Sequence, residues 1–122
     1  ENADALVNML GLVKSQYPAV ALQKLLSVRQ KYPENAGVVA QIGLTYAGMK
    51  NNKDAHRYLN MAMQIEPNNA LHAYNQAVVY DREGNRDKAV DMYDQALRTD
   101  AIYGGGRSVN RDVIYDRLSK LR

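Results

Sequence analysis

The chain has 122 residues, of which 46% are hydrophobic and 24% are charged, with 8 Gly and 3 Pro. This composition predicts one globular domain and excludes a disordered or collagenous chain. Because the chain has no Cys, it can form no disulfide, thiolate metal site or cysteine nucleophile, and the cytoplasm and the periplasm stay equally open as its compartment. Charged and amide residues interrupt every apolar run before the roughly 18 residues of a membrane-spanning helix, so we expect no direct membrane insertion.

The formal net charge of +3 is not evenly distributed along the chain. Residues 1–102 carry 11 Lys/Arg and 11 Asp/Glu, whereas residues 103–122 carry 5 Lys/Arg and 2 Asp/Glu. A neutral, evenly mixed body is typical of the solvated surface of a helical protein, and not of the broad basic surface that binds nucleic acid. We therefore expect no nucleic-acid partner and interpret the basic C-terminal residues as a solvated face.

An internal repeat of 34 residues is the strongest feature of the sequence. It places Pro33 over Pro67, and the same ungapped register superposes three further sets of positions: Leu12, Tyr46 and Tyr80; Ala21, Ala55 and Ala89; Leu25, Leu59 and Tyr93. Within each unit the apolar residues follow helical spacing in two blocks, and a polar turn separates them at residues 49–54 and 82–87. Each unit is therefore predicted to be a helix hairpin, with the small Ala positions and the larger apolar positions, including Tyr46, Tyr80 and Tyr93, in its core.

The ends of these helices carry recognisable signals. Pro33 and Pro67 each follow a helical block, and Pro ends a helix because it lacks the amide hydrogen and clashes with the preceding turn. Short polar residues that can accept hydrogen bonds from free helix amides stand where the next helices are expected to begin: Asn35, Asn69, Asp54 and Asp87.

These residues resemble the tetratricopeptide repeat family, whose unit is a 34-residue helix hairpin. The second unit matches the family pattern at Val39, Ile42, Gly43, Tyr46, Ala55, Leu59, Ala62 and Pro67. The third matches at Ala73, Ala77, Tyr80, Ala89, Tyr93 and Ala96, and departs from it at Gln76 and Ala101. The first matches at Ala5, Leu12, Ala21, Leu25 and Pro33, and departs from it at Asn8, Met9 and Val28.

The resemblance implies an all-α fold, a right-handed α-solenoid with hairpins at residues 2–35 (degenerate), 36–69 and 70–103. Residues 104–108 are expected to form a Gly-rich linker, and residues 109–122 a C-terminal capping helix. The departures in the first unit fit either a further repeat or domain upstream or an atypical terminal repeat.

The C-terminal segment breaks the repeat register at three consecutive glycines, which are poorly suited to a helix interior. A last helix is predicted to follow, with Ser108 or Asn110 as its N-cap and an apolar stripe at Ile114, Leu118 and Leu121. The segment 104–107 is interpreted as a hinge or linker in preference to an anion-binding loop, because a nucleotide-binding loop requires Gly-Lys-Ser/Thr after a strand.

Nothing in the sequence predicts catalysis, a metal site or a cofactor. His56 and His72 show no metal-ligand spacing and are predicted to lie on the surface, and Asp91 and Asp94 are interpreted as solubilising charges. We therefore expect a protein that is not an enzyme.

The resemblance also identifies positions on the first helix of each hairpin that line a concave groove, which is expected to bind a protein or peptide: Leu6, Leu10, Val13, Ala40, Leu44, Ala47, Leu71, Tyr74, Asn75, Val78 and Arg82. These residues are mostly apolar and lack the Lys, Asn and Arg clamp with which some relatives hold acidic C-terminal tails. They favour an amphipathic helix or extended peptide as ligand, in an adaptor or scaffold module. The alternative is a self-assembling module whose groove takes a second copy, giving a homo-oligomer. The Asn-rich turns and residues 109–118 are similar to bacterial repeat proteins of pilus, secretion or envelope assembly.

Overall fold

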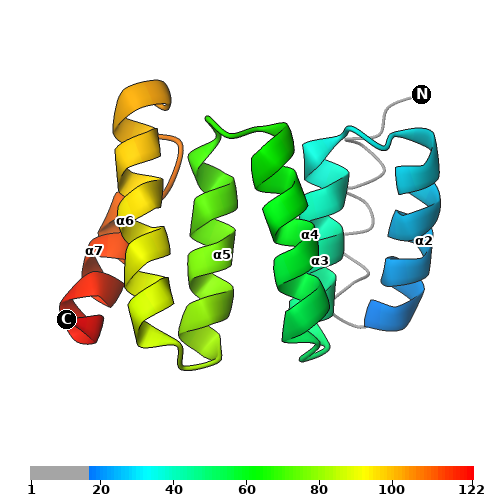
Figure 1. The fold of residues 1–122 in the computed structure, drawn as a ribbon, viewed down its shortest axis with the longest axis horizontal. Coiled ribbons are helices and arrows are strands. Elements are labelled where there is room, and N and C mark those ends of the chain that lie inside the picture. Colours follow the sequence, from blue (N-terminus) through cyan, green and yellow to red (C-terminus); the bar gives the residue numbers. More distant parts are fainter. Residues whose placement is uncertain (1–16) are drawn as a thin grey trace. The chain divides into compact units, whose positions relative to one another are not determined.

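The computed structural model describes residues 17–122, and this part of the chain is entirely helical (Figure 1). The helices are α2 (Pro18–Lys31), α3 (Ala36–Gly48), α4 (Asn52–Ile65), α5 (Ala70–Arg82), α6 (Arg86–Tyr103) and α7 (Arg111–Leu121). The all-α class predicted from the sequence is confirmed. The chain divides into two compact units, Glu1–Ile65 and Glu66–Arg122. No described helix is long and apolar enough to cross a membrane.

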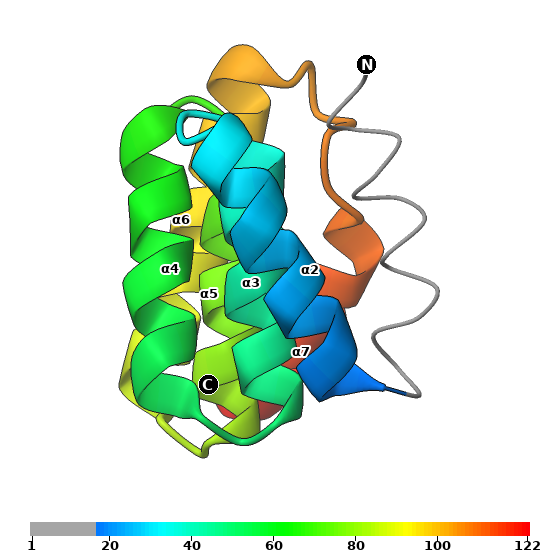
Figure 2. The same cartoon turned by 90° about the vertical axis from the view of Figure 1, so that its right-hand side faces the viewer.

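The first unit contains the α3/α4 hairpin, with α2 packed on α3 (Figure 2). The hairpin closes tightly at Gly43, because a Cβ atom there would lie 2.8 Å from Cγ of Leu59 and 3.0 Å from the carbonyl oxygen of Ala55. The helix α2 contributes two buried residues to the core of this unit, Ala21 and Leu25. The fully buried apolar residues of α3 and α4 are Val38, Val39, Ile42, Ala55, Leu59 and Ala62. Tyr46 is only half-buried and stacks on Tyr58, with 5.6 Å between ring centroids.

The second unit contains the α5/α6 hairpin and α7, which packs on α6 (Figure 1). Ala89, Tyr93 and Ala96 of α6 are buried. Buried residues of α5 complete the core, among them Ala73, Gln76 and Ala77. Of the three tyrosines expected in the core, Tyr93 is buried, whereas Tyr46 and Tyr80 are half-buried because each lies near a hairpin turn.

Asparagine, and not aspartate, caps the helices of both hairpins. Asn35 and Asn69 cap α3 and α5 as predicted, by accepting the amide hydrogens of Val38 and Leu71. The second helices were expected to be capped by Asp54 and Asp87, and this expectation is wrong. The caps are Asn51, whose Oδ1 accepts from the amide of Asp54 at 3.3 Å, and Asn85, whose Oδ1 accepts from Lys88 at 3.4 Å. Asp54 and Asp87 lie inside the first turn instead, where a carboxylate favours the positive end of the helix dipole.

The last helix, α7, buries Ile114 and Leu118 of the predicted apolar stripe against the hairpin. Of the two N-caps considered, Asn110 is the one used, since its Oδ1 accepts the amide hydrogen of Val113 at 3.3 Å. Ser108 is bound elsewhere, in the loop that joins α6 to α7.

Candidate functional site

The predicted groove residues are found on the first helix of each hairpin. Leu6, Leu10 and Val13 lie outside the described residues. In the first unit, Ala40 is buried, and Leu44 and Ala47 are half-buried on α3. In the second unit, the remaining five share α5: Leu71, Tyr74, Asn75, Val78 and Arg82.

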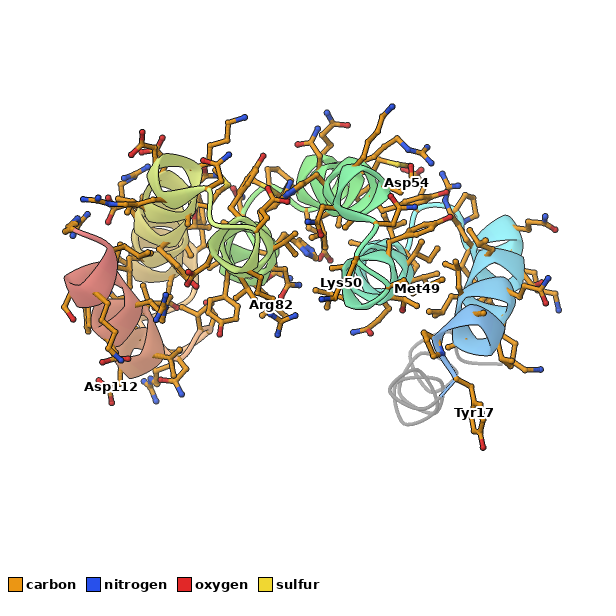
Figure 3. All side chains as sticks on the ribbon, turned by 90° about the horizontal axis from the view of Figure 1, so that it is seen from below. Tyr17, Met49, Lys50, Asp54, Arg82 and Asp112 are labelled. Atoms are coloured by element: carbon orange, nitrogen blue, oxygen red, sulfur yellow. The ribbon has the colours of Figure 1, made fainter. Side chains whose placement is uncertain are left out.

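These five residues define the α5 face. Their spacing of three or four residues places them along one side of the helix. Leu71 leaves 44% of its surface exposed, and the Tyr74 ring lies against Tyr93, with 6.2 Å between centroids. Arg82 is exposed at the C-terminal end of α5, where its side chain extends away from α6 (Figure 3). The α5 face is therefore an apolar stripe that ends in a cation.

The basic residues of the C-terminal segment are not simply a solvated face, because three of the five pair with the preceding hairpin. Three arginines bind aspartates of the α5/α6 hairpin: Arg111 binds Asp100 at 2.5 Å, Arg117 binds Asp81 at 2.8 Å and Arg122 binds Asp94 at 2.5 Å. Asp94 is thus the partner of Arg122, the residue that caps the C-terminal end of α7, and not a free solubilising charge. The expectation failed because partners 11 to 36 residues apart in sequence leave no local pattern.

The Gly-rich loop is organised around a buried aspartate. Oδ1 of Asp100 accepts hydrogen bonds from the amide of Ser108 at 2.7 Å and from its hydroxyl at 2.5 Å. The backbone carbonyl of Asp100 accepts from the amides of Gly104 and Gly106. Gly106 has a φ of 74°, a conformation that favours glycine. The loop amides are thus bound within the protein, those of Gly104 and Gly106 by the backbone carbonyl of Asp100 and that of Ser108 by its carboxylate, which is consistent with the preference for a structural role over anion binding.

Two of these carboxylates are held in the charged form. The hydrogen bond from Ser108 lowers the pKa of Asp100, with Arg111 adding to the effect. The pKa of Asp81 is lowered first by its bidentate partner Arg117 and then by the Tyr93 hydroxyl, which donates to Oδ2 at 2.9 Å. Burial and the neighbouring Asp81 in turn raise the pKa of Tyr93.

His72 was expected on the surface, and the structure places it in the core with 3% of its surface exposed. Its Nε2 donates to Oε1 of Glu66 at 2.8 Å, and no described residue bonds its Nδ1. The repeat register superposes His72 on Val38, a fully buried position. That register was the signal that could have predicted its burial.

The partner of this histidine, Glu66, lines a hollow of about 450 Å³ between the loop that precedes α5 and the end of α6. We call it the Glu66 hollow, and its walls are Glu66, Pro67, Asn68, Asn69, Ala70, Tyr103, Gly104 and Ser108. Hydrogen bonds from His72 and Asn69 lower the pKa of Glu66, so the carboxylate is charged at neutral pH. In residues 17–122, no group of three or more His, Asp or Glu is placed to hold a metal ion.

The described helices pair into hairpins of the kind found in helical repeat proteins. A family model for the tetratricopeptide repeat matches residues 73–103, which cover most of α5 and all of α6. This match agrees with the family resemblance seen in the sequence, over the part of the chain that forms the α5/α6 hairpin. Repeats of this kind act in general as protein–protein interaction modules. No curated protein matches the chain.

Proposed function

We propose that the α5 face binds an apolar segment of a partner protein, an amphipathic helix or an extended peptide, and that the chain acts as a non-catalytic adaptor. The exposure of Leu71 carries this proposal. It leaves 44% of its surface to solvent on the first helix of the hairpin that the family model matches. Val78 continues the stripe, Tyr74 and Asn75 flank it, and Arg82 adds a cation at its end, which suits a ligand with apolar anchors and an acidic end.

The α3 residues Ala40, Leu44 and Ala47 are proposed to form a binding surface of their own in the first unit. Their small or partly buried side chains allow close approach of a ligand backbone, while Leu44 supplies apolar contact. A role in bacterial pilus, secretion or envelope assembly is part of the same proposal, and it follows from the resemblance that the sequence suggested for residues 109–118.

To test this proposal, peptides that bind the wild-type chain are selected from a displayed peptide library, and their affinities for the wild type and for variants are measured. Leu71→Asp is expected to weaken the selected peptides at least tenfold, because it places a charge in the apolar stripe. Val113→Asp on α7 is the matched control, since Val113 is 41% exposed and lies outside the α5 face. Equal loss in both variants, or in neither, would contradict the assignment.

The alternative is self-assembly, in which the same face takes a second copy of the chain. Light scattering coupled to size exclusion over a wide concentration range separates the two. A mass that stays monomeric supports a foreign ligand, whereas a mass that grows with concentration and reverts in Leu71→Asp supports self-assembly.

A further inference from the structure

Burying a polar imidazole costs free energy unless it is hydrogen-bonded, and the buried side chain of His72 forms a hydrogen bond with Glu66. Its side chain is 4% exposed, and it bonds Glu66, whose side chain is 50% exposed. Asn69 donates to the same oxygen, Oε1, at 3.1 Å. Both donors bind the same oxygen of the carboxylate, and half of the Glu66 side chain is exposed, so the carboxylate can accept a further hydrogen bond from a ligand.

The walls around this carboxylate select the kind of ligand. Pro67 and Ala70 are apolar, and Tyr103, which is 60% exposed, adds an aromatic ring. A hollow lined by both an anion and an aromatic residue suits a cation. A guanidinium group suits it better than an ammonium group, because it is planar, stacks on rings and is more weakly hydrated.

The surrounding backbone does not oppose a cation. The N-terminal end of α5 brings partial positive charge to the hollow, and the C-terminal end of α6, at Tyr103, brings partial negative charge. These contributions have opposite signs, so the charge of Glu66 decides the sign of the site.

We propose that the Glu66 hollow binds an arginine side chain of a partner protein, with the guanidinium group on the Glu66 carboxylate and against the Tyr103 ring. The volume of about 450 Å³ accommodates one long side chain and lies in the range of small-ligand sites. This proposal rests on the general role of the chain in protein binding but not on the α5 face. Leu71→Asp leaves the hollow intact, so the failure of one proposal can be told from that of the other.

The test is an NMR titration of the full ¹⁵N-labelled chain with Nα-acetyl-arginine-N-methylamide, with the neutral citrulline analogue as the reference ligand. The arginine compound is expected to give saturable shifts at the amides of Asn68, Asn69, Gly104 and Ser108. The citrulline compound is expected to bind at least tenfold more weakly, because it has the shape but not the charge. Equal binding of both compounds, or shifts scattered over the whole chain, would overturn the proposal.

Variants of the hollow make the test specific. Glu66→Gln keeps the size of the side chain and an acceptor for His72 but removes the charge, and is expected to lower affinity at least tenfold. Tyr103→Leu, at an exposed position that tolerates substitution, is expected to lower it several-fold. Arg107→Gln is the control, since Arg107 is exposed in the neighbouring loop but does not line the hollow, and its loss should leave binding unchanged or slightly stronger. Unchanged binding in Glu66→Gln overturns the proposal. A titration of the wild type with Nα-acetyl-lysine-N-methylamide that gives the same affinity as the arginine compound also overturns it.

Discussion

Arg117 and Asp81 form a bidentate ion pair that joins α7 to α5 across 36 residues of sequence. Nε and one terminal nitrogen of the arginine each lie 2.8 Å from a carboxylate oxygen, and the Tyr93 hydroxyl donates to the same carboxylate. One side chain on α7 thereby contacts a carboxylate that α6 also binds through Tyr93. The pair fixes α7 on the hairpin more specifically than apolar contact alone can do.

Arg117→Gln is therefore expected to lower the midpoint of thermal unfolding by a few degrees, because it leaves Asp81 with only the Tyr93 hydrogen bond. The control is Lys120→Gln, which removes an ion pair with Asp116 within α7 whose two side chains are 60% and 59% exposed. Exposed pairs of this kind contribute little, so the control should unfold like the wild type. Equal shifts in both variants would show that Asp81 needs no arginine.

Stability is expected to fall in acid. The pKa values of Asp81 and Asp100 are lowered in the folded chain, so the unfolded chain, with aspartate near about 3.9, binds more protons as the pH falls. The stabilisation is fully present above about pH 5 and is lost progressively as the pH drops through the folded-state pKa values. Urea unfolding from pH 7 to pH 2 measures this, and Asp100→Asn should flatten the acid slope. An unchanged slope in that variant would count against the role of Asp100.

Gly43→Ala tests the close approach of α3 and α4. The new Cβ would lie 2.8 Å from Cγ of Leu59 and 3.0 Å from a backbone oxygen, which cannot move cheaply, so we expect a loss of about 1–3 kcal/mol in the free energy of unfolding. Gly48→Ala is the matched control in the same helix, since its Cβ would meet nothing within 4 Å. That substitution should stabilise the chain by about 0.4–1 kcal/mol, because it restricts the unfolded state. Urea denaturation of both variants gives the comparison.

His72→Val tests why a polar residue lies in the core. Val38 is the residue at the corresponding position of the previous repeat, so valine should fit, and it removes a buried Nδ1 that no described residue bonds. Stability is expected to stay level or to rise slightly. Binding of the arginine compound should fall at the same time, because Glu66 loses the hydrogen bond from His72 that holds its carboxylate in place. A large loss of stability with unchanged binding would show that the histidine serves the core instead.

The repeat made much of the fold predictable. Helix type, the buried Ala21, Ala55 and Ala89, and the caps at Asn35 and Asn69 follow from local patterns that recur every 34 residues. Capping by Asn51 and Asn85 was missed, because an aspartate two or three residues further on fits the same composition rule, and only the exact start of the helix decides between them.

The features around α7 and Glu66 could not be predicted in the same way. The partners Asp81 and Asp100 belong to the last hairpin alone, so no second repeat reveals them. From the sequence alone, Glu66 is an ordinary polar residue before Pro67. Its role depends on the hydrogen bond from the buried His72, which no local pattern predicts. Repetition in the sequence identifies what the repeats share, and the features that distinguish this chain are those that occur once.

The Arg–Asp pairs make the attachment of α7 more sensitive to the solvent than the core of the α5/α6 hairpin is. Only Ile114 and Leu118 of α7 are buried, whereas the α5/α6 core is held by tightly packed apolar residues. Acid protonates the aspartates of these pairs and weakens them more than it weakens apolar packing, and salt adds to this at the more exposed Arg122–Asp94 pair, so α7 should detach before the hairpin opens. Amide hydrogens of α7 would then exchange with solvent faster than those of α6. The pH and ionic composition of the solvent, and not the stability of the core, would set how often the surface of α6 beneath α7 is uncovered.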